Sequence, residues 1–253
     1  MKIFDLTGKE ALVTGSSQGI GLALAEGLAQ AGAKIILNGR NKKKLIAAAK
    51  HLKQNYNSIS VLRFDVTDHS QVNQKINEHY GSGGRIDILV NNAGIQYRAP
   101  LEDFPPEQFE LLMKTNVSSI FNVGQAVAKY MIREGKGKII NIASVQTALA
   151  RPGIAPYTTT KGAVSNLTKG MATDWASKGL QVNAIAPGYF KTPLNAALVA
   201  DPDFSSWLKK RTPAGRWGEV KELVGACIFL AAASSSFVNG QTIFVDGGIT
   251  ASL

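Results

Sequence analysis

Apolar and polar positions follow two patterns along this chain. Short apolar runs rich in β-branched residues predict strands, and longer segments with apolar residues three or four positions apart predict helices. The strands are expected at residues 10–14, 34–38, 59–64, 86–91, 137–143, 180–186 and 242–246. The helices are expected at about residues 19–30, 42–54, 70–80, 106–133, 157–178 and 220–232. Strands that are apolar almost throughout, each followed by a helix, indicate an α/β fold with a doubly wound, seven-stranded parallel sheet.

No segment of the chain marks a boundary between domains. Its 253 residues, 45% of them hydrophobic, contain no Pro/Ser-rich linker, low-complexity tract, charge block or internal repeat. A chain of this size can bury one large core, so we expect a single domain over residues 1–253. Residues 188–218 interrupt the strand–helix alternation at the edge of the sheet where ligands bind. A long irregular connection there predicts a mobile substrate lid.

The formal net charge of +10 raises the question of nucleic-acid binding. The positive residues are spread along the chain and accompany no recognition motif, so we expect anionic small molecules as partners and no nucleic acid. The longest apolar run, residues 225–233, is far shorter than the roughly 20 residues of a membrane span. Charged residues precede any run suited to a signal peptide. We therefore expect a cytoplasmic protein without membrane contact.

The segment TGSSQGIG, residues 14–21, follows the first expected strand and opens the first expected helix. Its glycines permit a tight turn and close approach of the backbone to a pyrophosphate, which the free amides of the helix N-terminus can bind. A glycine cluster alone is a weak signal, but this one stands at the front of a βαβ unit, so a mere flexible turn explains it poorly. The cofactor contacts expected here are Gly15, Ser17, Gln18, Gly19, Ile20 and Gly21.

The end of the second strand bears on the choice between NADP and NAD. An acidic residue there would bind the ribose hydroxyls of NAD, whereas this chain has Asn38 and Arg40. A guanidinium matches a phosphate bidentately, so we predict NADP(H) as the cofactor. The alternative, with Arg40 as a surface charge and NAD as the cofactor, stays open because Gln18 stands where a second basic residue could have helped.

The third and fourth strands end in residues suited to the rest of a dinucleotide. Asp65 and Val66 are placed to bind the edge of an adenine, although Asp65 could instead cap the following helix. Asn92, Ala93 and Gly94 can lie along a cofactor and lock neighbouring strands, although alone they could form only a turn. None of the three histidines stands in a setting for a catalytic triad or a metal ligand, so no metal site is expected.

These motifs occur in order with four further polar residues and a PG dipeptide: Asn116, Ser144, Tyr157, Lys161 and residues 187–188. Together they resemble the short-chain dehydrogenase/reductase family over about residues 5–248. The resemblance implies a Rossmann-type fold, a nicotinamide cofactor, reversible alcohol/carbonyl chemistry and self-association as a homotetramer or homodimer. It also implies further cofactor contacts from Tyr157, Lys161, Pro187, Gly188 and Thr192.

The Tyr157/Lys161 pair accounts for this chemistry in physical terms. Residues four apart on a helix share one face. A free phenol has a pKa of about 10 and is a poor base at neutral pH. A nearby ammonium and the positive ring of an oxidised nicotinamide would lower that pKa, so we expect Tyr157 to exchange a proton with the substrate. By the resemblance, Lys161 also holds the nicotinamide ribose, Ser144 stabilises the substrate oxygen and Asn116 positions a water in a proton relay.

The segment that shapes the substrate pocket includes APGYFKTPLN and WLKKRTPAGRWG. It resembles the branch of the family that interconverts gluconate and 5-keto-gluconate. We expect Arg151 to pair with the carboxylate of such a sugar acid, because it falls between Ser144 and Tyr157. Gln146 and Asn195 are expected to bind hydroxyl groups of the substrate.

Two other functions stay open at this point. A 3-oxoacyl-[acyl-carrier-protein] reductase shares the core motifs and would use the basic surface to dock an acidic carrier protein. A regulator that senses NADP without turnover belongs to a different class, but such a protein need not retain the serine, tyrosine and lysine together. Activity on acyl thioesters against activity on keto-sugar acids separates the two enzymes.

Overall fold

Seven parallel strands form one sheet in the computed structural model, which describes residues 2–253. The strand order is β3-β2-β1-β4-β5-β6-β7. The chain therefore starts near the middle, builds one edge and then crosses back past β1 to build the other half. The strands are β1 (Glu10–Val13), β2 (Lys34–Leu37), β3 (Ile59–Val61), β4 (Ile88–Asn91), β5 (Gly137–Ile142), β6 (Leu180–Pro187) and β7 (Thr242–Val245). All seven expected strands are confirmed.

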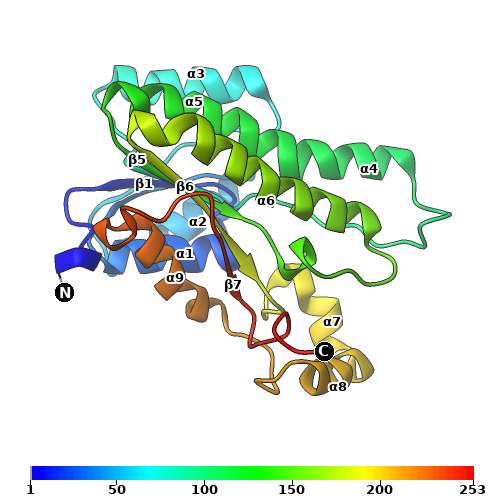
Figure 1. Ribbon diagram of the computed structural model, residues 1–253. Helices are drawn as coiled ribbons and strands as arrows, with labels where there is room; N and C mark the ends of the chain where they lie inside the picture. The colour runs from blue at the N-terminus through cyan, green and yellow to red at the C-terminus, as the bar shows by residue number, and fades with distance from the viewer. Residues whose placement is uncertain (1) are drawn as a thin grey trace.

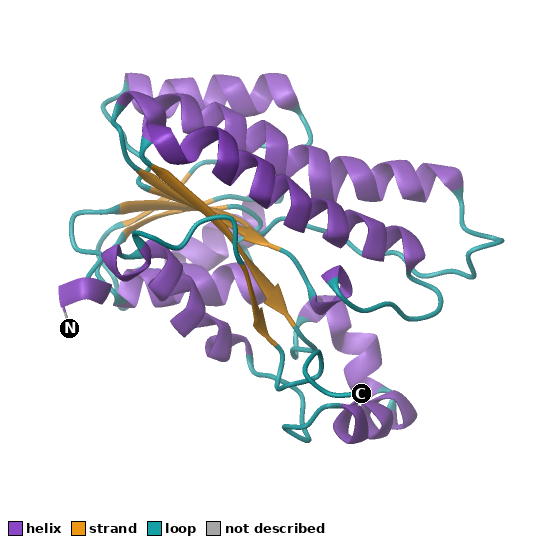
Figure 2. Ribbon diagram, viewed as in Figure 1, coloured by secondary structure: helices purple, strands orange, loops and turns teal. Residues whose placement is uncertain are grey.

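Helices cover both faces of this sheet (Figures 1 and 2). One face carries α1 (Gly19–Gln30), α2 (Lys42–Leu52) and α9 (Val224–Ala231). The other face carries α3 (His69–Gly81), α4 (Pro106–Met113), α5 (Ser119–Arg133) and α6 (Ala155–Trp175). Short 3₁₀ turns lie at Lys2–Phe4, Val145–Thr147, Ala176–Lys178, Pro193–Asn195, Val220–Leu223 and Ala233–Ser235. Two clusters of buried apolar side chains match the two helical layers, which confirms the doubly wound α/β architecture.

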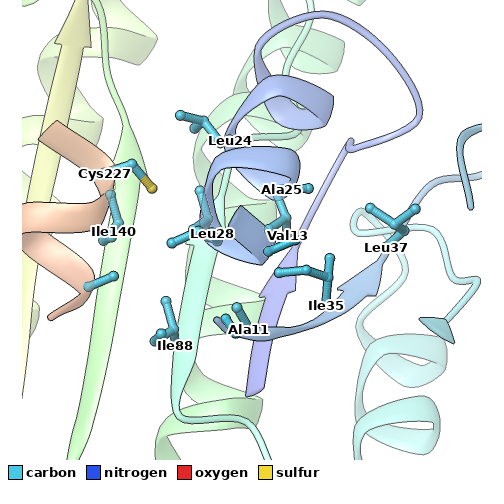
Figure 3. Packing of buried hydrophobic residues seen from close by; sticks show 14 of the residues in the cluster. Ala11, Val13, Leu24, Ala25, Leu28, Ile35, Leu37, Ile88, Ile140 and Cys227 are labelled. Carbon is cyan, nitrogen blue, oxygen red and sulfur yellow. The ribbon is translucent and has the colours of Figure 1, made fainter. Parts of the chain in front are cut away.

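The core between the sheet and its first helix shows why these runs of sequence fold together. Leu24 and Leu28 of α1, Ile88 and Ile140 of the strands, and Cys227 of α9 belong to one buried cluster (Figure 3). Each of the five side chains is at most 1% exposed. Burial of each large aliphatic side chain contributes roughly 1.5–3 kcal/mol relative to leaving it in water.

The expected irregular connection over residues 188–218 was partly wrong. The structure places two short helices there, α7 (Ala196–Ala200) and α8 (Pro202–Arg211), beyond the carboxyl ends of β6 and β7 (Figure 1). Asp201 caps α8, because its Oδ1 accepts hydrogen bonds from the backbone N–H groups of Asp203 and Phe204 at 3.0 Å. Pro202 occupies the first helical turn, where a missing N–H costs nothing. The DPD triplet was therefore a helix start signal.

The expected single helix over residues 106–133 is also interrupted. A π-helical turn, Lys114–Ser118, separates α4 from α5. Such turns insert one extra residue into the helical ladder and are frequent at functional sites. Here the turn holds Asn116, which is 1% exposed.

The carboxyl end of β1 is the place where the winding of the sheet reverses, since its neighbours are β2 on one side and β4 on the other. The Oγ1 of Thr14 accepts hydrogen bonds from the N–H groups of Asn92 (2.9 Å) and Ala93 (3.1 Å). The Asn92 side chain donates back to the Thr14 carbonyl at 2.9 Å. These bonds lock β1 to β4, as the sequence predicted, and leave a crevice for a ligand between the diverging loops. Among residues 2–253, no helix combines the length and apolarity needed to cross a bilayer.

We predict that Gly27→Ala destabilises the protein by about 1–3 kcal/mol through overpacking. A Cβ at Gly27 of α1 would collide with Cγ1 of Val224 and lie 2.8 Å from its Cγ2. The two helices would therefore have to separate. The free energy of unfolding, measured by urea denaturation, checks this prediction.

Gly225→Ala is the matched control, because a Cβ there meets nothing within 4 Å. Gly225 is the second residue of α9 and has no positive φ, so its replacement by alanine should stabilise the protein by roughly 0.4–1 kcal/mol. If Gly27→Ala proved as stable as the original protein, close contact of α1 with α9 would not be a constraint on the fold.

Candidate active site

A cavity of about 560 Å³ lies at the carboxyl ends of the strands. Every site residue expected from the sequence lines it except Asn116, and the lining thus joins segments from the whole chain. The expected residues found there are Gly15, Ser17, Gln18, Gly19, Ile20, Gly21, Asn38, Arg40, Asp65, Val66, Asn92, Ala93, Gly94, Ser144, Gln146, Arg151, Tyr157, Lys161, Pro187, Gly188, Thr192 and Asn195.

The loop after β1 has the geometry of a phosphate cradle. Gly15 and Gly19 adopt φ values of +62° and +60°, a region that favours glycine. A Cβ on Gly15 would lie 2.9 Å from the Cα of Ala93, and one on Gly21 would lie 2.6 Å from the Gly15 carbonyl oxygen. No side chain caps the N-terminus of α1, so its first N–H groups are free to bind an anion.

Directly after β2, the side-chain oxygen of Asn38 is buried without a hydrogen-bond partner in the described chain. Asn38 is completely buried, and its Nδ2 donates to the carbonyls of Leu62 (3.0 Å) and Phe64 (3.2 Å), which fixes the orientation of the amide. Its Oδ1 has no hydrogen-bond partner among the described residues. A buried acceptor left unpaired is costly, so the cavity offers this oxygen to a hydroxyl or amine of a ligand. The cradle and this acceptor together fit a dinucleotide.

Arg40 and Asp65 meet at the rim of the cavity. The Arg40 Nη1 lies 3.6 Å from Asp65 Oδ2. Partial burial opposes ionisation of Asp65, but hydrogen bonds from Thr67 and the Arg40 guanidinium hold the pKa of its carboxyl below the usual value. Asp65 does not cap the next helix, since Asp68 does so by accepting from the N–H of Gln71 at 3.0 Å. The capping alternative for Asp65 was therefore wrong.

Ser144, Tyr157 and Lys161 converge at the middle of the cavity. Ser144 follows β5 and is 8% exposed, with its Oγ accepting the N–H of Gln146 at 3.2 Å. Tyr157 and Lys161 lie in the first two turns of α6, where the lysine nitrogen is 5.7 Å from the centroid of the phenol ring. The Lys161 Nζ donates a 2.7 Å hydrogen bond to the carbonyl oxygen of Ile142, the last residue of β5.

Desolvation shifts the pKa values of this group in the protein on its own. Tyr157 is only half-buried, but desolvation in the cavity raises its pKa to about 12, and a hydrogen bond with Ser144 opposes the rise. Burial lowers the pKa of Lys161 to about 8. In the protein on its own, desolvation of the phenolate outweighs the effects of neighbouring groups, and the lysine ammonium binds a carbonyl. The lowering expected from the lysine together with an oxidised nicotinamide ring stays a prediction.

Asn116 does not line the cavity. Its Oδ1 accepts the N–H of Ile95 at 2.8 Å, and its Nδ2 donates to the Ile95 carbonyl at 3.0 Å and to Oγ1 of Thr160 at 3.1 Å. The side chain thus ties the loop after β4 to α6. This geometry gives Asn116 a positioning role, while a proton relay through a water stays a prediction.

The far end of the cavity is cationic. Arg151 places its guanidinium 5.3 Å from the ring centroid of Phe204 in α8, and its buried Nε has no hydrogen-bond partner in the described chain. Arg98 lies close enough that burial and, next, the like charge of Arg151 lower the pKa of its guanidinium. Neither arginine has a carboxylate partner within residues 2–253. An anion bound between them would relieve this repulsion.

Tyr189 and Lys44 are among the cavity residues that the sequence analysis missed. Tyr189 follows the PG dipeptide directly, and its Oη accepts a long hydrogen bond from Gln146 Nε2 at 3.5 Å. Lys44 lies in the first turn of α2, and its contact with Gln18 joins two elements that are distant in the sequence. Asn195 lines the cavity but uses its Nδ2 on the Phe190 carbonyl at 3.1 Å.

The charges around the cavity favour anionic ligands. Five cationic side chains line it and only one carboxylate, Asp65, is among them; the cations are Arg40, Lys44, Arg98, Arg151 and Lys161. No cluster of three or more histidine, cysteine or acidic side chains is placed to hold a metal ion anywhere in residues 2–253.

Comparisons with known proteins agree with this geometry. A family model described as enoyl-(acyl carrier protein) reductase matches residues 15–250. The gluconate 5-dehydrogenase of Gluconobacter oxydans is 59% identical over 251 residues, which cover 99% of this chain and 98% of that enzyme. The 5-keto-D-gluconate 5-reductase of Escherichia coli K12 is 45% identical over 247 residues, covering 98% of this chain and 97% of that enzyme.

A solved structure agrees as well. The crystal structure of a gluconate 5-dehydrogenase from Burkholderia cenocepacia in complex with NADP and tartrate superposes with a TM-score of 0.97. That protein is 58% identical, and the match covers 100% of this chain and 99% of the other. With the order of motifs, the sheet and the cavity residues, these likenesses show that the chain belongs to the short-chain dehydrogenase/reductase family.

Proposed function

We propose that the protein is an NADP(H)-dependent oxidoreductase that interconverts gluconate and 5-keto-gluconate. The observation that carries the proposal is one cavity holding a phosphate cradle, the Ser144/Tyr157/Lys161 group and two arginines without carboxylate partners. The similarity to enzymes named for gluconate and 5-keto-gluconate supports this substrate over other ketones.

Tyr157 is the proton donor and acceptor in this proposal. When a ketone is reduced, the phenol Oη gives its proton to the oxygen that becomes the alcohol, and in the oxidation it takes that proton back. Because the pKa of Tyr157 is about 12, the phenol is almost fully protonated near neutral pH and is ready to act as an acid. Ser144 Oγ is placed to hydrogen-bond the same substrate oxygen and so to orient it.

Lys161 contributes a positive charge beside that phenol. Its ammonium is held by the Ile142 carbonyl in a buried site, so its positive charge acts at low effective dielectric. A nicotinamide bound beside this group would supply or accept the hydride, and its positive oxidised ring would add a second charge that favours the phenolate. For oxidation of the alcohol, these two charges must offset the burial that raises the pKa of Tyr157.

The carboxylate of the sugar acid has its counter-charges at the far end of the cavity. Arg151 is held by Phe204, and its buried Nε needs a partner. A substrate carboxylate would supply that partner and would separate the like charges of Arg151 and Arg98. Gln146, whose Oε1 is also without a partner in the described chain, is available to a substrate hydroxyl.

Residues 188–218 and self-association complete the proposal. Pro193, Leu194 and Leu198 of this segment line the cavity, which supports a role for it as a substrate lid.

Exposed aromatic side chains at Phe121 and Phe237 support a homodimer or homotetramer, which sedimentation of the protein would test.

The proposal predicts a clear preference in an activity panel with NADPH and NADH over 5-keto-gluconate, a neutral ketose and an acetoacetyl thioester. 5-Keto-gluconate with NADPH should give the highest kcat/KM. Tyr157→Phe should lower kcat by a factor of about 10³, in the range for loss of a general acid, with the Kd for NADPH unchanged. Retention of a tenth of the activity in Tyr157→Phe would remove the tyrosine from its role, and preference for NADH or the thioester would contradict the assigned cofactor or substrate.

A second prediction concerns Arg151. Arg151→Ala should raise the KM for 5-keto-gluconate about tenfold or more, because an ionic hydrogen bond contributes roughly 1.5–3 kcal/mol, while the KM for a neutral ketose should change little. Lys191→Ala is the control, since this lid lysine is paired with Glu219 at 2.6 Å. An unchanged KM for 5-keto-gluconate in Arg151→Ala would assign the carboxylate to another residue.

A further inference from the structure

The adenosine end of the cavity has a basic corner formed by Gln18, Arg40, Asn41 and Lys44. The sequence suggested only Arg40 as a ligand for a 2′-phosphate, because position 18 carries a neutral glutamine. The structure brings a second cation to that position from another element. The Lys44 Nζ donates a hydrogen bond to Gln18 Oε1 at 3.3 Å, so the ammonium of α2 lies beside the phosphate loop.

The backbone of this corner is well defined. Asn41 caps α2, its Oδ1 accepting the N–H of Lys44 at 3.0 Å. Arg63 donates from Nε to the Arg40 carbonyl at 2.9 Å and braces the turn that leads into the helix. Lys44 therefore begins from a fixed backbone position within one turn of Arg40, and both side chains face the same cavity.

The two cations differ in how far their charge is neutralised. Arg40 lies 3.6 Å from Asp65, whose carboxyl is held ionised by its hydrogen bonds. Lys44 has no carboxylate partner in the part of the chain that the structure describes. Lys44 is thus the uncompensated positive charge at this end of the cavity.

The groups around Lys44 indicate which kind of ligand would neutralise its positive charge. Lysines fill the first turn of α2 at residues 42–44, next to the positive end of the helix dipole, and no acidic residue relieves them. The completely buried Asn38 Oδ1, in the same lining, lacks a donor among residues 2–253. A ribose that carries a 2′-phosphate and a neighbouring hydroxyl offers both the anion and a donor.

We propose that Lys44 is a second ligand of the cofactor 2′-phosphate and that the preference for NADP(H) depends on it together with Arg40. This inference rests on the proposed function only in taking NADP(H) as the cofactor. It makes Lys44 a specificity-determining residue, whose loss weakens binding of the phosphate without affecting the rest of the dinucleotide or the reacting groups.

Binding of cofactor fragments tests this proposal without any turnover. Calorimetric titrations at low ionic strength would compare 2′,5′-ADP with 5′-AMP on the full-length protein and on the variants Lys44→Met and Lys43→Met. The second variant removes the same charge from the same helical turn at a residue that does not line the cavity. Since an exposed ion pair contributes up to about 1 kcal/mol, Lys44→Met should raise the Kd for 2′,5′-ADP about fivefold.

The outcomes distinguish this inference from the function on which it rests. The Kd for 5′-AMP should stay within about twofold in both variants, and Lys43→Met should leave both ligands unaffected. Equal effects of Lys43→Met and Lys44→Met on 2′,5′-ADP, or equal loss of both ligands in Lys44→Met, would overturn the role of Lys44. If Arg40→Met weakened 2′,5′-ADP while Lys44→Met did not, only this inference would fail. A starting protein that binds 2′,5′-ADP no better than 5′-AMP would overturn the NADP(H) assignment itself.

Discussion

The hydrogen bond from Lys161 to the last carbonyl of β5 is the contact on which the site depends. It measures 2.7 Å and joins α6 to the sheet at Ile142, so the lysine, and with it Tyr157 one turn earlier, has a fixed place at the carboxyl edge. The same bond satisfies an ammonium that burial would otherwise penalise heavily. Because the sheet is parallel, this edge also receives the phosphate cradle after β1 and the locked loop after β4.

The balance of charges in the cavity explains how Tyr157 and Lys161 can serve both the reduction of a ketone and the oxidation of an alcohol. Burial alone favours the neutral forms of both partners, since it raises the pKa of Tyr157 to about 12 and lowers that of Lys161 to about 8. Around them the cavity is strongly cationic, with Arg98 and Arg151 at one end and Arg40 and Lys44 at the other. An anionic cofactor and an anionic substrate would each offset part of this charge, which couples their binding to the chemistry of the phenol.

Much of this fold and site could be predicted from local patterns. Apolar runs located all seven strands, because the strands of a covered parallel sheet are buried on both faces. Glycine spacing located the phosphate cradle, because a positive φ is sterically favourable only for glycine. The helices at residues 196–211 were missed, although Asp201 and Pro202 form a start signal, since helices of five and ten residues are too short to show a clear helical period. The raised pKa of Tyr157 in the protein alone could not be predicted from the sequence, because i,i+4 spacing gives proximity but not burial. Lys44 was missed because its contact with Gln18 joins two elements that only the folded sheet brings together.

The central claim is that burial keeps Tyr157 protonated until the cofactor shifts its pKa. A pH titration of tyrosinate absorbance, taken as the difference between the original protein and Tyr157→Phe, tests this most directly. In the protein alone, Tyr157 should give no difference signal up to about pH 10, because burial raises its pKa to about 12, and a signal should enter that range when NADP⁺ is added. A pKa at or below the ordinary phenol value of about 10 in the protein alone, or no shift with NADP⁺, would contradict the account.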